Sequence, residues 1–447
     1  MKKRLMLSAV AVGLISSVNV SAADDLGSMF SEGKVNGQIR AFFIDREYQG
    51  SAGNTTHRSS TAIGGNLKYE TAQLNGFSLG TAFYTTNKLA TGSVTDATLF
   101  GENNEGYSIL GEAYVQYKNA NTVFKGGRQK LNTPLMGADD ARMLPNLFEA
   151  YVLTNKDIAN VTLSAAHVTK FAQGTFGRAY SASSAANQLL SVTAGYSYVD
   201  PQNQVGKFTD MGTYAFGRST DGVSIVSAAY KANDNLKVQV WDYYAHDIMN
   251  AIYAQADLSW KCLLSDNVKP SLSVQAIKEN EVGDDLAGKL DGAYWAAKFQ
   301  AKVQSLTASI AYSQTSKNSA AEAAAGGLAN AIVTPWGGMP AYTQGMVTRH
   351  QFLAGTKATK AALNYNFKDM GANLSTTLYY ASFDMDANSG YGIDRTASES
   401  GFDVIYYPET IKKLQLRLRG NFPRKFHESA SGDTGWNEYR VIANYNF

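Results

Sequence analysis

The chain has 447 residues, of which 44% are hydrophobic and 17% are charged, and its formal net charge is +2. So small a net charge argues against a nucleic-acid-binding protein, and the single cysteine, Cys262, excludes an internal disulfide. Beyond the first residues, no apolar run is long enough for a transmembrane helix, which excludes a helical membrane protein. The 26 tyrosines and only 8 prolines are typical of a strand-rich chain with proline confined to loops.

Residues 1–22 have the pattern of a cleaved secretory signal peptide. A basic start at residues 2–4 precedes an apolar run at residues 5–15 and the small-residue cleavage site Val20-Ser21-Ala22. The alternative, an uncleaved anchor, is disfavoured because the run is too short to span a bilayer as a helix. We therefore expect a mature chain of residues 23–447 that forms one domain. Loss of the three basic residues leaves it nearly neutral.

From residue 35 onward, segments of alternating apolar and polar residues are separated by turn residues, which indicates β-strands. Short connections, such as 73–76 and 119–121, alternate with long polar ones, such as 47–61 and 87–106. This alternation is typical of an outer-membrane barrel, with short periplasmic turns and long extracellular loops. The predicted strands are 35–45, 62–71, 77–86, 107–118, 122–130, 148–155, 161–170, 223–231, 236–245, 251–261, 270–277, 293–303, 306–314, 351–366, 373–383, 401–407, 414–421 and 438–447.

The predicted fold is therefore all-β, a transmembrane antiparallel β-barrel of 18 strands that encloses an aqueous channel. Residues 171–222 are ambiguous, because 189–199 and 208–218 also have strand character. Counting both gives twenty strands, and either number returns the termini to the periplasm. We prefer eighteen, with these two segments as a hairpin beyond the membrane. In the long loop 315–349, the Ala-rich part 320–331 predicts a helical turn.

The last predicted strand has an apolar face and a polar face. The apolar face suits lipid, and the polar face, with Ile442 as its one departure, suits an aqueous lumen. A terminal aromatic residue of this kind resembles the signal that the barrel assembly machinery reads in bacterial outer-membrane proteins. We therefore expect an integral protein of the outer membrane of a Gram-negative bacterium, with membrane lipid and, through Phe447, the barrel assembly machinery as partners. The apolar face comprises Tyr439, Val441, Ala443, Tyr445 and Phe447, and the polar face Arg440, Asn444 and Asn446.

Basic residues in the strands identify the face toward the lumen, because an arginine or lysine facing lipid at mid-membrane costs about 2–4 kcal/mol. With Leu414, Leu416 and Leu418 toward lipid, Arg417 and Arg419 point inward beside Arg440 and Arg40. Such a row offers successive weak sites to a carboxylate. The alternative is a set of salt bridges to inward acids, of which Asp403 is a candidate. For Lys68 and Lys302, a place in the pore and snorkelling to headgroups both remain open. The predicted pore-lining ladder is Arg40, Arg128, Arg417, Arg419, Arg440, Lys298 and Lys360.

The segment 126–150, GGRQKLNTPLMGADDARMLPNLFEA, is the most distinctive internal motif. It holds Asp139, Asp140 and Arg142 among more leucine and methionine than a water-exposed loop needs. We expect this third extracellular loop to fold inward, pack against the wall and present these charges at a constriction. The alternative is an ordinary surface loop with an acidic turn.

This segment resembles the OprD family of outer-membrane porins, through Gly127-Arg128, residues 131–135, Asp140 to Asn146 (DARMLPN) and Phe148-Glu149. A second similarity is TPWGGMPAY at 334–342. The resemblance covers essentially the whole mature chain. It implies an eighteen-stranded passive channel with an arginine ladder and a narrowing third loop, which admits amino acids, carboxylates or other small solutes. Loop lengths depart from the family, above all in 171–222.

The leading hypothesis is a water-filled channel for passive diffusion of small hydrophilic solutes, favouring anionic or zwitterionic ones such as carboxylates and amino acids. An outer-membrane enzyme is a second class, but the histidines lie scattered without catalytic or metal-ligand spacing, so we expect no catalytic residue, metal or cofactor. A third class is a surface adhesin or structural barrel with a plugged lumen. A homo-oligomer stays open, because lipid-facing and subunit-facing residues look alike. The histidines are His57, His167, His246, His350 and His427.

Overall fold

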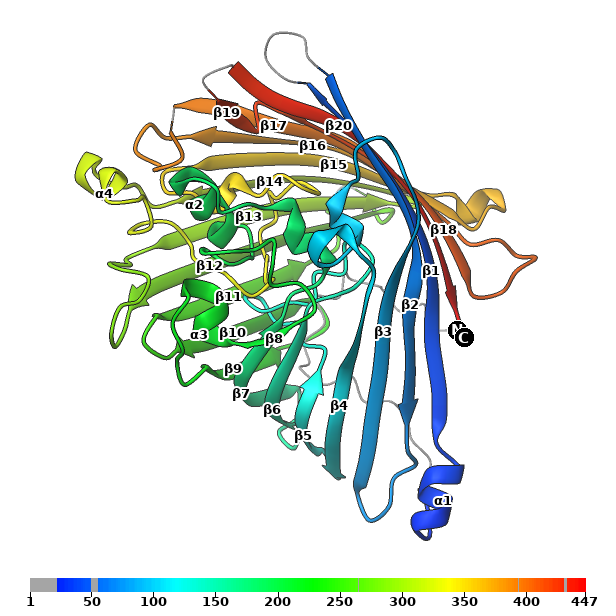
Figure 1. Cartoon of the computed structure of the whole chain (residues 1–447). Helices are drawn as coiled ribbons and strands as arrows, with labels where there is room; N and C mark the ends of the chain where they lie inside the picture. The colour runs from blue at the N-terminus through cyan, green and yellow to red at the C-terminus, as the bar shows by residue number, and fades with distance from the viewer. Residues whose placement is uncertain (1–21, 50–54, 264, 393, 430–431) are drawn as a thin grey trace.

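The computed structural model describes residues 22–49, 55–263, 265–392, 394–429 and 432–447. The predicted signal peptide lies, up to residue 21, outside the described residues. Within them, eighteen long strands form the barrel seen in Figure 1. They are β1 (Lys34–Gln49), β2 (Thr55–Glu70), β3 (Phe77–Thr91), β4 (Tyr107–Asn119), β5 (Thr122–Gln129), β6 (Leu147–Asn155), β7 (Val161–Ala172), β9 (Val223–Lys231), β10 (Leu236–Ala245), β11 (Met249–Ser259), β12 (Val268–Glu281), β13 (Ala293–Val303), β14 (Leu306–Thr315), β15 (Lys357–Asn366), β16 (Leu374–Met385), β17 (Arg395–Tyr406), β18 (Leu414–Arg424) and β20 (Gly432–Asn446).

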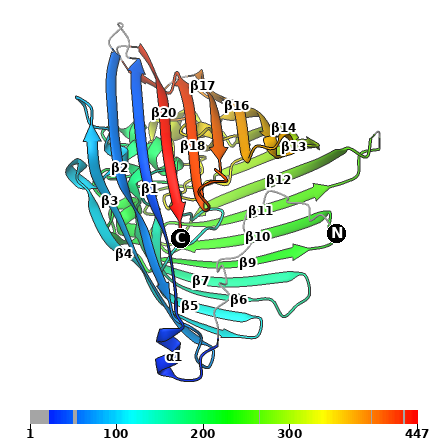
Figure 2. The same cartoon turned by 90° about the vertical axis from the view of Figure 1, so that its right-hand side faces the viewer.

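The barrel closes where the first strand meets the last. Each strand pairs antiparallel with the next along the chain, except that β7 pairs with β9 and β18 with β20 around two short strands. Those are β8 (Phe208–Asp210), beside β7, and β19 (His427–Ser429), beside β20. Figure 2 shows β20 between β1 and β18, and the backbones of Gly37 and Phe447 exchange two hydrogen bonds of 3.2 and 3.1 Å. Closure pairs every edge, and the predicted eighteen-stranded barrel is confirmed.

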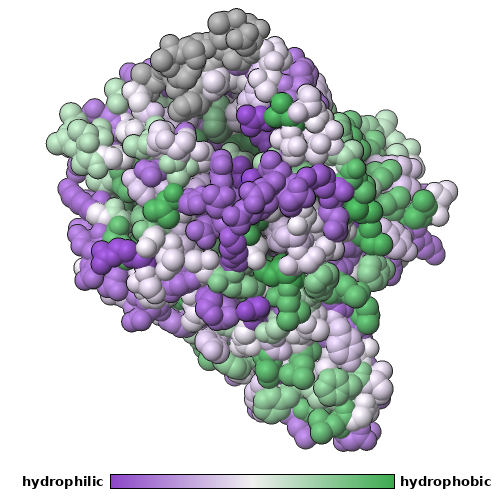
Figure 3. All heavy atoms as spheres, in the orientation of Figure 1, coloured by the Kyte–Doolittle hydropathy of each residue, from purple (hydrophilic) through white to green (hydrophobic). Residues whose placement is uncertain are grey.

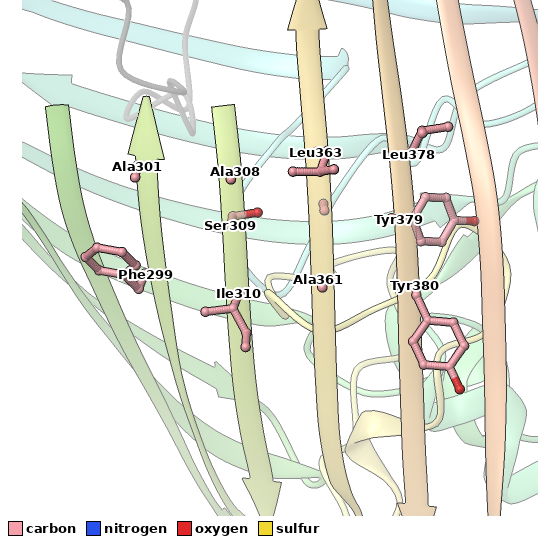
Figure 4. A pocket seen from close by; sticks show the side chains of 11 residues that line it. Phe299, Ala301, Ala308, Ser309, Ile310, Ala361, Leu363, Leu378, Tyr379 and Tyr380 are labelled. Carbon is pink, nitrogen blue, oxygen red and sulfur yellow. The ribbon is translucent and has the colours of Figure 1, made fainter. Parts of the chain in front are cut away.

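Large apolar side chains cover the outside of this wall. On β14 and β16, Ile310 is 60% exposed and Leu378 is 54% exposed, an arrangement that only lipid makes favourable. Figure 4 shows Ala301, Ala308 and Ala361 of β13, β14 and β15 as the floor of a shallow groove of about 530 Å³ on this face. In Figure 3, hydrophobic residues gather over the right-hand and lower parts of the view.

The segment between β7 and β9 is helical, and the predicted hairpin at 189–199 and 208–218 is wrong. It contains α2 (Ala185–Thr193) and α3 (Met211–Phe216), at one mouth of the barrel (Figure 1). Side-chain caps explain the helices: the Ser184 hydroxyl accepts from the N–H of Asn187 at 3.3 Å, and Asp210 accepts from that of Thr213 at 2.9 Å. Their apolar residues pack inward, against the strands and the long loop.

Other short helices lie in the connections. The predicted helical turn is present as α4, whose N-terminus has a capping box of Ser319 and Glu322. The predicted strand 351–366 begins late, because residues 350–352 form a 3₁₀ turn. Within the described residues, no helix has both the length and the apolar character to cross a membrane. The remaining helices are α1 (Leu26–Ser31), α4 (Ala320–Ala324), η2 (Ala97–Leu99), η3 (Glu102–Asn104), η4 (Thr175–Ala179), η5 (His350–Phe352) and η6 (Phe367–Met370).

Candidate functional site

Four predicted arginines lie side by side at the closing seam; we call Arg40, Arg417, Arg419 and Arg440 the seam arginines. They occupy β1, β18 and β20, on the face that alternates with the outward leucines and valines. The register of β18 and β20 places Arg419 directly opposite Arg440. Their side-chain exposure is graded, from 0% for Arg440 through 9% for Arg40 and 15% for Arg419 to 28% for Arg417. Arg417 is therefore the seam arginine most accessible from the lumen.

Two inward carboxylates accompany the seam arginines, so the ion pairs considered from the sequence also form. Asp403 accepts from Nε of Arg417 at 2.7 Å and lies 3.5 Å from Nε of Arg419. Glu438, which sequence reasoning missed, is fully buried, and its Oε1 lies 3.0 Å from Nε of Arg440. Because the arginines outnumber the carboxylates, the seam keeps an excess of positive charge.

The segment between β5 and β6, residues 130–146, packs on two separate parts of the inner wall. Leu135 and Met136 are buried in a cluster with Trp241 of β10. Met143 and Leu144 are buried in a different cluster, with Phe42 of β1 and strand β3. The segment therefore crosses the interior from one side to the other, and its apolar residues serve as anchors at both ends.

The charged residues of this segment bind the seam. Arg40 donates from Nη1 to Oδ1 of Asp140 at 2.7 Å and from Nη2 to Oδ2 at 3.3 Å. Arg142 is fully buried, and it donates from Nη2 to Oε1 of Glu438 at 2.8 Å. Its guanidinium also lies over the Phe176 ring, at 4.8 Å. Burial lowers the pKa of Arg142 to about 10, which leaves it charged at neutral pH.

Asp139 points away from the seam and binds Arg349, a residue that sequence reasoning missed. Arg349 donates from Nη1 and Nη2 to the two carboxylate oxygens, at 2.8 and 2.9 Å, and the Tyr196 hydroxyl donates to Oδ2 at 2.5 Å. This bidentate pair links the third loop to the long loop between β14 and β15. The sequence does single out Arg349, which is the one charged residue between positions 323 and 356, as a candidate for an ion pair.

The long loop is held at further points by residues on the inner wall. Glu399 of β17 accepts from the backbone N–H groups of Met346 and Thr348, at 2.6 and 2.7 Å. Lys360, predicted to line the pore, points inward and donates to the Gln344 carbonyl at 2.7 Å. Lys298 also points inward, and its ammonium lies 4.6 Å from the centre of the Tyr342 ring. Both lysines thus contact the loop as well as the interior.

Arg128 lies elsewhere, and the structure does not place it in the ladder. Its cross-strand partner is Glu149, with Nε 3.7 Å from Oε2. Glu149 shares its face with Tyr151, which is 54% exposed on the outside of the barrel. The face was misassigned because Gly126 and Gly127 precede Arg128 and carry no side chains from which to infer the alternation. Lys68, left open from the sequence, points inward to Glu112, at 3.2 Å.

A cavity of about 440 Å³ lies between the two loops and the inner wall of β10, β11 and β13. Asp139 and Arg349 line it from the loops and Lys298 from the wall. The remaining lining combines rings with neutral amides, so a solute here meets one ammonium and many hydrogen-bonding groups. These rings and amides include Trp241, Tyr253, Tyr342, Gln239 and Gln255.

His167 and His246 lie together on the barrel wall, and His350 makes a separate contact. His167 and His246 are each 3.2 Å from the Ser224 hydroxyl, whereas His350 is buried with Nε2 2.9 Å from the Phe426 carbonyl. In the part of the chain that the structure describes, no three His, Cys, Asp or Glu side chains gather as metal ligands would. The His427 side chain lies outside the described residues.

A closed antiparallel barrel with an apolar outer wall and a charged interior defines the class of outer-membrane porins. A family model described as outer membrane porin, OprD family, matches residues 28–447. The chain therefore belongs to the OprD family and is an integral porin of the outer membrane of Gram-negative bacteria. The family consists of transport channels rather than enzymes.

Solved structures of similar fold come from Pseudomonas. OpdK of Pseudomonas aeruginosa, solved with vanillate, has a TM-score of 0.73 and 14% identity, over 94% of this chain and 99% of that one. OccK9 (OpdG) of the same organism has a TM-score of 0.74 and 18% identity over the same shares. A BenF-like porin from Pseudomonas fluorescens Pf-5 has a TM-score of 0.74 and 17% identity, again over the same shares. No curated protein sequence matches this chain.

Proposed function

We propose that this porin favours small anionic or zwitterionic solutes, such as carboxylates and amino acids, and that the seam arginines provide the preference. The observation that carries the proposal is the graded exposure of the seam arginines along β1, β18 and β20, from buried Arg440 to Arg417 at 28%. A guanidinium matches the two oxygens of a carboxylate and stays charged at every physiological pH.

Asp403 partly neutralises the seam arginines, and this weakens their binding of a solute enough for transport. Asp403 shares its charge between Arg417 and Arg419, at 2.7 and 3.5 Å. A passing carboxylate therefore competes with an existing acceptor, which weakens its binding. Conduction requires sites that are favourable enough to enter and weak enough to leave.

The third loop supplies the constriction in this proposal. Asp139, Asp140 and Arg142 hold it to Arg349, Arg40 and Glu438. These charges act as anchors that fix the passage, and the solute passes between this loop, the long loop and the wall. The cavity of about 440 Å³ beside them favours a channel over a plugged structural barrel or adhesin. The relatives that were solved with vanillate and with glucuronate each hold a carboxylate, in keeping with this preference.

Reversal potentials in planar bilayers, measured across a potassium chloride gradient, test the proposal. We expect an anion-selective reversal potential for the wild type, and a shift toward cations for Arg417→Gln. Arg128→Gln is the matched control, because it removes the same charge from the outer face and should leave the potential unchanged. Cation selectivity of the wild type, or no difference between the two variants, would contradict the proposal.

A further inference from the structure

A second basic cluster lies at the periplasmic mouth of the barrel, away from the seam. It consists of Lys261, Lys269 and Lys302, and we call it the exit lysines. They border a cavity of about 420 Å³ at the ends of β11, β12 and β13, where these strands reach their short connections. Because β12 is the eleventh of the eighteen barrel strands within the described residues, the cluster lies across the barrel from the seam.

Strand register gathers the exit lysines on the inward face. Lys302 lies two and four residues beyond Gln300 and Lys298 on β13, and it pairs directly with Lys269 of β12. The Trp260 N–H donates to the Pro270 carbonyl at 3.2 Å, which extends the β11–β12 pairing by one step and brings Lys261 alongside Lys269. Adjacent strands are about 4.8 Å apart. The three lysine side chains therefore extend from neighbouring positions on the inner wall.

A row of neutral polar groups lies one step deeper. Ser259 pairs with Ser271, and Ser271 pairs with Gln300, on the same inward face as the lysines. All three line the cavity. Hydroxyl and amide N–H groups are donors that an oxygen anion accepts from. The cavity thus combines three cations with three neutral donors.

The charges of the exit lysines are not balanced locally. Within the described residues, none of the three forms an ion pair, and Asp266 is the acid among the lining residues. Like charges directly opposite each other in a sheet are destabilising, so an anion between Lys269 and Lys302 would relieve their repulsion. Snorkelling to lipid headgroups does not account for the pair, because its side chains belong to the face of the lumen.

We propose that the exit lysines form an anion site at the periplasmic mouth, which takes a compact oxyanion of two or more negative charges. Ammonium groups act as point charges on rotatable stems and suit phosphate or clustered carboxylates, whereas the planar seam arginines suit single carboxylates. Anions on the periplasmic side then meet a site that anions on the outer side reach only through the constriction. The proposal rests on the proposed channel only for its electrical test.

Binding is measured first, with purified full-length protein in a phosphate-free detergent and inorganic pyrophosphate as the probe. By ³¹P NMR titration, we expect saturable binding to the wild type. We expect at least a tenfold loss of affinity in the triple variant Lys261→Gln, Lys269→Gln and Lys302→Gln. The pair Lys269→Arg and Lys302→Arg keeps the charge and should keep binding.

The matched control removes three lysines from other periplasmic connections, as Lys156→Gln, Lys368→Gln and Lys412→Gln, and should bind like the wild type. No binding by the wild type, or the same loss in this control, would overturn the proposal. Heat-modifiable migration on gels confirms that each variant is a folded barrel.

The electrical test adds pyrophosphate to one side of a single channel at a time. We expect block from one side at a concentration at least tenfold lower than from the other, and near-equal concentrations in the triple variant. Normal conductance without a sided block would refute the exit site and leave the proposed function standing. Pyrophosphate binding without any conductance would refute the proposed function and leave the site standing.

Discussion

Removal of the Glu438 charge is the sharpest test of how the third loop is held. The carboxylate is fully buried between Arg142 of the loop, at 2.8 Å, and Arg440 of β20, at 3.0 Å. Both guanidiniums have no exposed side-chain surface. Glu438→Gln preserves the shape of the side chain and removes the negative charge that lies between the two buried cations.

The expected cost is that of breaking a buried ion pair, about 3–5 kcal/mol. The strands β1 and β20 keep their backbone hydrogen bonds, so we expect the cost to appear in the loop, with Arg142 leaving its site. This free-energy cost corresponds to a shift of about 100-fold to about 5,000-fold in the equilibrium between the loop attached to the wall and the loop released from it. A released loop should widen the passage, and it should make the current noisier.

Single-channel recording checks this expectation, with Glu47→Gln as the control. Glu47 lies on β1 and is 39% exposed, so the same substitution there should leave conductance and noise unchanged. The double variant Arg142→Met with Glu438→Gln should show a positive coupling, because it also removes one of the two stranded charges. Wild-type conductance and noise in Glu438→Gln would refute the reasoning that this pair holds the loop.

Further predictions concern the other loop contacts and the cavity. Arg349→Met leaves Asp139 without its bidentate partner, so we expect excess current noise. The double variant with Asp139→Asn should reduce this noise. Equal noise in the single and double variants would contradict the proposal that this pair links the two loops. Lys298→Met should weaken block by carboxylates several-fold, because its ammonium lines the cavity. The control Lys278→Met should not, because Lys278 binds Asp291 near the extracellular end of β12. The concentration of benzoate needed for block is compared between the two variants. Burial by itself raises the pKa of Asp140, but Arg40, together with Lys130 and Arg417, lowers it more, so the pKa lies below its ordinary value. A carboxyl group whose pKa is lowered in the folded protein stabilises the fold at neutral pH, and this stabilisation is lost only as the pH falls through the lowered pKa. Current noise at pH 4 should therefore still match that at pH 7, and a rise near pH 4 would show that Asp140 titrates at its ordinary value.

The barrel and its seam follow from local rules that a sequence displays. Strand alternation places Arg417 and Arg419 opposite leucines, and the lipid penalty decides which face is inside. The Asp403 contact was foreseeable for the same reason, since it lies on the neighbouring strand. Cleavage after residue 22 and recognition of Phe447 by the assembly machinery stay predictions.

The contacts of the loops could not be read in the same way. Arg349 and Asp139 are 210 positions apart, and only the three-dimensional path of two loops brings them together. Residues 189–199 alternate like a strand, but the Ser184 cap and burial of Leu189 and Val192 favour a helix. Arg128 was misassigned because glycines hide the alternation. For the loop contacts and the helix, tertiary packing outweighs the local pattern.

The central claim is that a guanidinium-lined passage selects solutes by their carboxylate. Single-channel recording of the wild type with benzoate and benzamide, which share a ring and differ in charge, tests it most directly. We predict concentration-dependent block by benzoate that weakens in Arg417→Gln, and none by benzamide at the same concentrations. Equal block by both compounds, or block by benzoate that is unchanged in Arg417→Gln, would contradict the account.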